Sequence, residues 1–202
     1  MTDYYSPLIE GNFYHVFNRG NNRENLFYSL RNYTYFLRKF DEHLSEFLDT
    51  YAYCLLPNHF HFLVRVKEWR TNSIAQSDGI VEVSAQISEQ FRRFFIGYSQ
   101  AINKQERRSG SLFQKEFKRI HVDSEKHLMC LVYYIHANPK NHRIVKDFRE
   151  YRHSSYRKIL IETPSKLLKK EVLGWFGSKE EFISFHDAIQ DLKDIERFMI
   201  ED

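Results

Sequence analysis

One stretch most constrains what this chain can fold into: Leu56-Pro57-Asn58-His59-Phe60-His61-Phe62-Leu63-Val64. It has the composition of a β-strand that is entered through a tight turn. Side chains alternate between the two faces of a strand, so His59 and His61 share one face. The opposite face is apolar and suits a core: Phe60, Phe62, Val64 and Val66. Two neighbouring imidazoles are a common beginning of a divalent-metal site, although a half-exposed strand with two histidines explains this stretch equally well.

Length and composition allow one good-sized domain and an appendage. The chain has 202 residues, 42% of them hydrophobic, and a net charge of +3, which permits a polyanionic partner without requiring one. Cys54 and Cys130 stand among apolar residues, which predicts reduced core thiols. The N-terminus lacks a signal-peptide pattern, and no run reaches the roughly 18 apolar residues of a membrane span. We therefore expect a cytoplasmic protein that does not bind a membrane.

Strand-like and helix-like patterns alternate along the first part of the chain. Apolar residues recur at helical spacing over 29–47, where Ser29 is a suitable N-cap, and over 84–104. The order β-α-β-β-α-β predicts an α+β, ferredoxin-like sandwich, a four-stranded sheet covered by two helices. A polar, aperiodic segment at 68–82 is interpreted as an exposed insertion. Besides the histidine strand, the predicted strands are 13–17, 50–56 and about 117–122.

A third helix is expected from about residue 124 to about residue 137, where Asn138-Pro139 stops it. At about 100° per residue, Tyr134 and Asn138 fall on one face beside an apolar stripe, and Tyr133 points to the far side. A tyrosine at the edge of a core is usually structural. In combination with the histidine strand, Tyr134 suggests instead a metal-assisted attack on a phosphodiester.

Basic side chains stand near aromatic ones in two places. Arg19 and Arg23 follow the first strand in a turn-rich segment, and guanidinium groups match phosphate oxygens. Further basic residues interleave with Phe113 and Phe117, a combination that suits phosphates and unstacked bases. A solvated surface is the alternative in both places. The basic residues of the second place are Lys104, Arg107, Arg108, Lys115, Lys118 and Arg119.

Beyond about residue 160 the pattern predicts a helical C-terminal extension. A short helix is expected over 163–174, and a longer one from Ser178 with an apolar side that reaches Phe198. The longer helix carries many acidic residues, which argues against contact with DNA. We therefore predict a catalytic domain over 1–160 and an extension over 161–202.

Five motifs follow one another over about residues 12–157. They are Tyr14-His15-Val16-Phe17-Asn18-Arg19-Gly20, Leu56-Pro57-Asn58-His59-Phe60-His61, Leu112-Phe113-Gln114, Tyr134-Ile135-His136-Ala137-Asn138-Pro139 and Tyr151-Arg152-His153-Ser154-Ser155-Tyr156. In this order they resemble the HUH single-tyrosine transposases, and among them the REP-associated tyrosine transposases of bacteria. The chain departs from that family at His153, where tryptophan is usual, and at residues 140–143. Both departures bear on the DNA sequence preferred.

The resemblance implies a ferredoxin-like domain that cleaves and rejoins single-stranded DNA near hairpins. It implies that Tyr134 is the nucleophile and forms a 5′-phosphotyrosine. His59, His61 and Asn138 would bind Mg²⁺ or Mn²⁺, although ligand type alone allows Zn²⁺ equally. The motif match raises Arg19 above the other candidates for DNA contact. The resemblance leaves open whether the tyrosine helix completes its own site or the site of a partner in a homodimer.

Two other functions remain as alternatives. The first is a domesticated relative that binds DNA or RNA hairpins without cutting them, but a pure binder has no need of the whole set of two histidines, tyrosine and asparagine. The second is an unrelated metal hydrolase with water as nucleophile, for which no carboxylate base stands near the histidine strand. Strand transfer through Tyr134 is the leading prediction.

Overall fold

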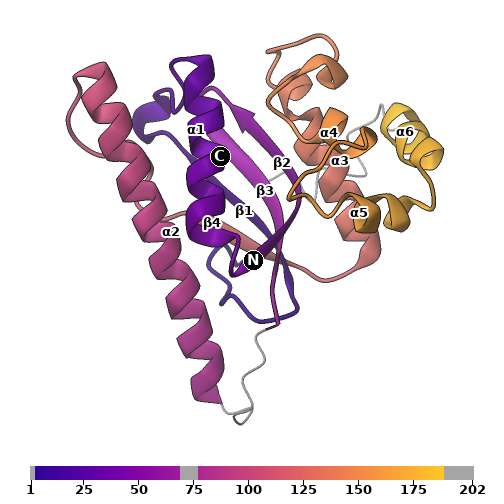
Figure 1. Ribbon diagram of the computed structural model, residues 1–202, viewed down its shortest axis with the longest axis horizontal. Helices are drawn as coiled ribbons and strands as arrows, with labels where there is room; N and C mark the ends of the chain where they lie inside the picture. Colours follow the sequence, from indigo (N-terminus) through magenta and orange to yellow (C-terminus); the bar gives the residue numbers. More distant parts are fainter. Residues whose placement is uncertain (1–2, 69–76, 189–202) are drawn as a thin grey trace.

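A four-stranded antiparallel sheet with helices on both faces organises the chain (Figure 1). The computed structural model describes residues 3–68 and 77–188. The strand order is β2-β3-β1-β4, and the connections run β1-α1-β2-β3-α2-β4. This is the split β-α-β arrangement, so the predicted α+β, ferredoxin-like fold class is confirmed. The elements are β1 (Phe13–Arg19), α1 (Leu30–Leu44), β2 (Leu48–Leu56), β3 (His59–Val66), α2 (Ser77–Glu106) and β4 (Lys118–Val122), with a 3-10 turn, η1 (Asn21–Arg23), after β1.

The two faces of β3 belong to two separate cores, as the alternation of its sequence predicts. Phe60 and Phe62 pack with α1 and α2, where Phe40 lies parallel to Phe62 with ring centroids 4.2 Å apart. Leu63 packs on the opposite face with the helix α3 (Glu125–Asn141). In Figure 1, α1 and α2 lie on one side of the sheet and α3 to α6 on the other. His59 and His61 are therefore enclosed between the sheet and α3.

The pairing of β3 with its two neighbours sets the register of the histidines. His59 lies opposite Leu56 across a two-residue turn, so the predicted hairpin of β2 and β3 is confirmed. On its other side, β3 pairs with β1, with Arg19 opposite His59 and Phe17 opposite His61. The side chains of Phe17 and Arg19 are thus on the same face of the sheet as His59 and His61.

Helix α3 runs through Pro139 to Asn141, which corrects the prediction that it stops at about residue 137. A proline removes the N–H that would bond the carbonyl of Ile135, at a cost of about 3 kcal/mol in a helix interior. The helix nevertheless continues, because His142 N–H donates to the Asn138 carbonyl at 2.9 Å and this segment is buried. Asn138 therefore keeps a helical position.

Helix α2 begins at Ser77, so residues 77–82 are helical and not part of the predicted exposed insertion. Residues 69–76 of that insertion lie outside the described residues. The polar composition of 77–82, which includes Gly79, does not predict a helix. These residues are helical because they are the first turns of a long helix whose later turns are held by apolar packing.

The C-terminal helices differ in their bounds from the prediction. They are α4 (Tyr156–Leu160), α5 (Lys169–Phe176) and α6 (Lys179–Ala188), with a second 3-10 turn, η2 (Phe148–Glu150), before them. The helix predicted over 163–174 begins only at Lys169, because Leu168 N–H bonds the Thr50 carbonyl of β2 at 3.0 Å instead. Gly177, with φ +94°, ends α5. The helix predicted to reach Phe198 is described to Ala188, and the division at residue 160 stays a prediction.

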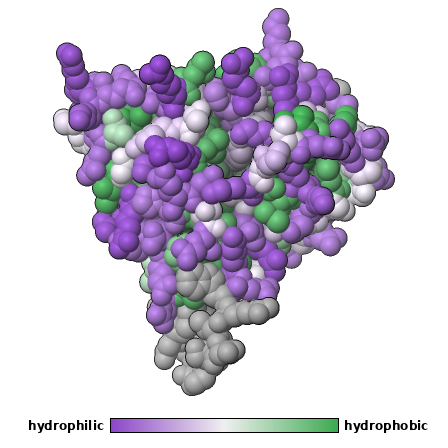
Figure 2. Space-filling view, viewed as in Figure 1, coloured by the Kyte–Doolittle hydropathy of each residue, from purple (hydrophilic) through white to green (hydrophobic). Residues whose placement is uncertain are grey.

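The prediction that both cysteines are core thiols agrees with the structure. Cys54 and Cys130 are buried free thiols. No helix in the described part of the chain combines the length and the apolar character that crossing a membrane requires. The face of the molecule in Figure 2 is mainly hydrophilic, with scattered hydrophobic patches.

A chain of buried histidines ties α6 to the sheet. His136 Nδ1 and His186 Nε2 are 3.0 Å apart, and His186 Nδ1 donates to the Phe182 carbonyl at 2.8 Å. His136 Nε2 lies 2.8 Å from Ser155 Oγ, which also accepts from the Tyr53 N–H. The bond to the Phe182 carbonyl places a proton on His186 Nδ1, so the neutral ring offers Nε2 as an acceptor to His136 Nδ1. Burial lowers the pKa of His186 from 6.5 to about 4.

We expect the free energy of unfolding to fall as the pH falls from about 6.5 towards about 4, because the unfolded state binds a proton at His186 in this window and the folded state does not. The contribution of this one residue is on the order of 3 kcal/mol. Urea unfolding at several pH values measures it. His186→Leu should be less stable above pH 6.5 but lose less stability on acidification, and an equally steep loss in this variant would contradict the assignment.

Candidate active site

The histidine strand and the tyrosine helix meet in the folded chain. The rings of His61 and Tyr134 lie edge to face with centroids 5.6 Å apart, and those of His59 and His61 lie 5.2 Å apart. Tyr133 faces the other way and contacts Phe148 and His186. Of the two adjacent tyrosines, Tyr134 is the one beside the histidines.

Asn138 lies between two contacts that join α3 to the histidines. Tyr134, Asn138 and His142 follow one another at intervals of four residues, which places them along one side of α3 and its C-terminal end. Tyr134 contacts His61, and His142 contacts His59 with ring centroids 4.6 Å apart. Helical spacing therefore places Asn138 on the side of α3 that faces the histidine pair.

Three buried acceptor atoms remain at this place. Asn138 Nδ2 donates to the Tyr134 carbonyl at 2.9 Å, which leaves its Oδ1 as an acceptor. Among the described residues, His59 Nε2, His61 Nε2 and Asn138 Oδ1 are buried and have no hydrogen-bond partner. A buried polar atom without a partner costs about 1–3 kcal/mol, so such atoms call for a ligand or another function. Two imidazole nitrogens and an amide oxygen fit a divalent cation.

The hydrogen bonds behind the histidines orient their Nε2 atoms. His59 Nδ1 lies 2.7 Å from Asn58 Oδ1, which can only accept, so Nδ1 carries the proton and Nε2 keeps its lone pair. His61 Nδ1 lies 2.9 Å from His15 Nε2 in a fully buried contact. When His61 donates in this contact, its Nε2 also offers a lone pair. Partners of this kind commonly fix the tautomer and the ring position of a metal-binding histidine.

Burial keeps these imidazoles neutral. Burial, followed by the nearby charges of His142 and Arg19, lowers the pKa of His59 to about 3. The pKa of His61 is well below 6.5 for the same reason, with His15 as the next cause, and burial lowers the pKa of His15 to about 3. Near neutral pH, the site therefore holds uncharged nitrogen donors, the form that binds metal.

Of the three proposed donors, only His59 and His61 belong to the residue types that most often bind metals. Over residues 3–68 and 77–188 no group of three or more His, Cys, Asp and Glu side chains could hold a metal. A site of His59, His61 and Asn138 is not of that kind, because its third donor is an amide. Neutral donors leave the full charge of a cation available to polarise a bound phosphate.

The predicted basic residues gather at the end of the sheet that carries His59. Arg19 ends β1 opposite His59, and its charge acts on both histidines. Lys118 begins β4 opposite Phe17 and lies over the Phe17 ring at 5.8 Å. Arg19 and Lys118 thus pair with residues on the face of the sheet that carries the histidines.

The other four cations stand in different settings. Arg23 ends the turn η1, and its carbonyl accepts from Asn58 Nδ2. Arg107 follows α2 and is exposed, whereas Arg108 binds Glu24 and Asn103. Arg119 Nε donates to the Ser6 carbonyl at 2.7 Å. The role of all six cations in DNA contact stays a prediction.

Sequence reasoning assigned no role to His15 or His142. His15 stands in a predicted strand, two positions before Phe17. Its contact with His61 depends on the register between β1 and β3, which neither strand shows by itself. His142 lies beyond the predicted end of the third helix, so the sequence does not predict that it shares a side of that helix with Tyr134. The signal for His142 is its spacing of four residues from Asn138.

Comparison with known proteins identifies a sequence relative and related solved structures. No protein-family model matches the chain. A curated protein of Haemophilus influenzae (strain ATCC 51907 / DSM 11121 / KW20 / Rd), named "Putative REP-associated tyrosine transposase", is 26% identical over 110 residues. The match covers 54% of this chain and 60% of that protein, so it spans less than two thirds of the relative. A solved structure of a REP-associated tyrosine transposase bound to a REP hairpin has a TM-score of 0.57 and 17% identity, over 81% of this chain and 89% of that chain.

The fold matches that of a solved tyrosine transposase, and the five motifs resemble those of the HUH single-tyrosine class. Within this class, the sequence relative and the related structure both carry the name of the REP-associated tyrosine transposases. The resemblance to that family, drawn from five motifs, is confirmed. The structural match establishes the fold, and it leaves the individual site residues to be tested.

We expect His59 and His61 to be neutral at about pH 5, with the proton on Nδ1 and a bare Nε2, because burial lowers both pKa values. Long-range ¹H–¹⁵N NMR spectra of labelled protein distinguish this tautomer from the other two forms. The urea-unfolded chain is the control, since its histidines should titrate near 6.5. An imidazolium signal from either residue at pH 5 in the folded protein would contradict the assignment.

Proposed function

We propose that this protein cleaves and rejoins single-stranded DNA beside a hairpin, through a covalent 5′-phosphotyrosine at Tyr134. The observation that carries the proposal is the meeting of Tyr134 with three buried acceptors, His59 Nε2, His61 Nε2 and Asn138 Oδ1. The names of the sequence relative and of the related structure support it, since the latter is bound to a REP hairpin. A homodimer and a cytoplasmic location stay predictions.

His59, His61 and Asn138 would hold the divalent metal. Imidazole suits transition metals and an amide oxygen suits harder ions, and the resemblance to the family favours Mg²⁺ or Mn²⁺. When bound, the cation would polarise the scissile phosphate and stabilise the charge on its oxygens. Asn58 and His15 would hold the two imidazoles in the orientation that this binding requires.

Tyr134 Oη attacks the phosphorus of the scissile phosphodiester. The new Oη–P bond forms as the bond from phosphorus to the 3′ oxygen breaks; the phenol loses its proton and the 3′ oxygen takes one up. The products are a 5′-phosphotyrosine and a free 3′-hydroxyl. Because the ester bond to phosphorus is retained, a second 3′-hydroxyl can reverse the step on another strand without ATP.

The side chains that cover Tyr134 have to move before a DNA phosphate can reach it. Tyr134 is 1% exposed, and His59 and His61 are 5% and 4% exposed. Arg19 and Lys118 flank the same face and would bind the phosphates on either side of the scissile one. Binding of the DNA backbone therefore has to displace the side chains that cover Tyr134, which makes recognition and chemistry a coupled event.

We expect Tyr134→Phe to abolish the covalent adduct while hairpin binding survives, because only the phenolic oxygen is removed. The assay is a denaturing gel with labelled single-stranded DNA from beside the gene, in Mn²⁺. Tyr133→Phe is the matched control and should keep the adduct, since Tyr133 contacts Phe148 and His186. An adduct in Tyr134→Phe would move the nucleophile elsewhere, and tight hairpin binding without any adduct in the wild type would favour a non-catalytic hairpin-binding protein.

We expect His15→Leu to lower the affinity for Mn²⁺ by roughly 10- to 100-fold, the usual effect of losing a partner that orients a metal ligand. His15→Gln offers an acceptor for His61 Nδ1 and should lose less. Calorimetric titration of the DNA-free protein with Mn²⁺ measures both, and His59→Ala serves as the variant that lacks a ligand. Equal affinities of the wild type and His15→Leu would show that His15 has no part in metal binding.

A further inference from the structure

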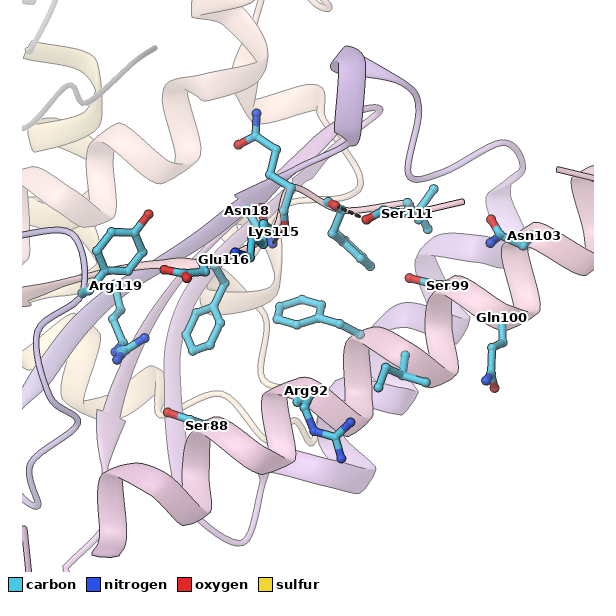
Figure 3. Close-up of a pocket in the computed structure, with 17 residues that line it drawn as sticks. Asn18, Ser88, Arg92, Ser99, Gln100, Asn103, Ser111, Lys115, Glu116 and Arg119 are labelled. Carbon is cyan, nitrogen blue, oxygen red and sulfur yellow. Dashed lines mark hydrogen bonds between the residues drawn. The ribbon is translucent and has the colours of Figure 1, made fainter. Parts of the chain in front are cut away.

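A cavity of about 640 Å³ lies between the C-terminal half of α2 and the segment 111–119 (Figure 3). Ser99 and Asn103 line it from the helix, and Ser111, Lys115 and Arg119 line it from the opposite wall, with Asn18. Its volume is within the range of about 300–1,000 Å³ that is usual for ligand sites. Neither Tyr134 nor the histidine pair lines this cavity.

The interior of the cavity is aromatic. The Phe95 ring stands 4.8 Å from that of Phe113 and 5.8 Å from that of Phe117, measured between centroids. Phe113 is buried, and Phe95 and Phe117 are only partly buried, so part of each of these two side chains remains exposed although Phe91 is stacked on Phe117. Flat aromatic surfaces of this kind stack on nucleobases with little dependence on base identity.

The rim supplies polar and positive groups around this interior. Among the lining residues, Arg92, Lys115 and Arg119 are cationic, and Glu116 is the carboxylate. Arg92 is paired with Glu89, and the Arg119 guanidinium lies over the Phe117 ring at 5.1 Å. Figure 3 shows the Ser99 hydroxyl directed from α2 towards the cavity. Hydrogen-bonding groups and a positive rim around an aromatic floor match a base that is joined to phosphates.

The cavity is connected directly to the end of the sheet that carries the active site. Asn18 lines the cavity, and the next residue, Arg19, lies opposite His59. The loop that forms the aromatic wall is bonded to the same strand end, since Gln114 N–H donates to the Arg19 carbonyl at 2.9 Å. Asn18 and Arg19 are consecutive residues of β1, so their side chains lie on opposite faces of the sheet. Asn18 faces the cavity, and Arg19 faces the side that carries His59.

We propose that this cavity binds one unstacked base of the single-stranded DNA that adjoins the hairpin. The proposal rests on the proposed function, because the strand that reaches the active site is the one that delivers the base. The strand passes the end of β1 at Arg19, and a nucleotide beside the scissile phosphate turns its base past Asn18 onto Phe95 and Phe117. Stacking there holds the register of the strand relative to Tyr134.

The test compares two tryptophan variants on α2. Ser99→Trp fills the cavity from its wall, and Gln86→Trp places the same ring at an exposed position that does not line the cavity. Fluorescence anisotropy, without divalent metal, measures the affinity for a labelled DNA hairpin with and without a single-stranded tail. We expect Ser99→Trp to weaken binding of the tailed hairpin roughly tenfold, the loss expected for one stacked base, and to leave the tailless hairpin unchanged. Gln86→Trp should bind both DNAs as the wild type does.

A second measurement uses the unaltered protein. Photo-crosslinking with 5-iododeoxyuridine, moved one position at a time along the tail, should give one position that crosslinks to Phe95, Phe113 or Phe117, identified by mass spectrometry. Equal tailed-hairpin affinities in both variants, or crosslinks only outside the cavity, overturn the base pocket and leave the adduct assay at Tyr134 to decide the proposed function. A wild type that binds no hairpin overturns both proposals.

Discussion

The antiparallel pairing of β1 with β3 is the interaction on which the site depends. It places Arg19 opposite His59 and Phe17 opposite His61, and it brings His15 Nε2 to 2.9 Å from His61 Nδ1. Because side chains alternate, a slip of one residue would turn this whole set towards the core under α1 and α2. The aromatic packing of Phe60 and Phe62 in that core therefore protects the register of the histidines.

A second core, on the opposite face, holds the tyrosine helix in place. Tyr133 and Tyr134 are adjacent, yet the first packs towards α6 and the second towards β3. The hydrogen-bonded chain through His136 and His186 fastens α3 and α6 to each other. The C-terminal helices thus contribute to the site by fixing which tyrosine faces the histidines, although none of their residues enters it.

The site retains polar atoms that folding alone would not favour. His59 Nε2, His61 Nε2 and Asn138 Oδ1 are buried acceptors without a hydrogen-bond partner in the described part of the chain, and each costs free energy in the unliganded protein. A bound cation would relieve that cost, so metal binding and stability are expected to be linked. The same burial keeps the imidazoles neutral and ready to bind.

The sequence by itself determined the element order, the two faces of β3 and the residues His59, His61, Tyr134 and Asn138, because these depend on local periodicity and on motif order. Only the tertiary structure decided that α3 continues through Pro139, since packing and the bond from His142 N–H outweigh the local preference of proline to end a helix. It also decided the contact of His15 with His61 and the aromatic cavity beside Asn18. Both require the register between strands and the path of a loop, which arise from contacts between residues far apart in the chain and leave no local pattern.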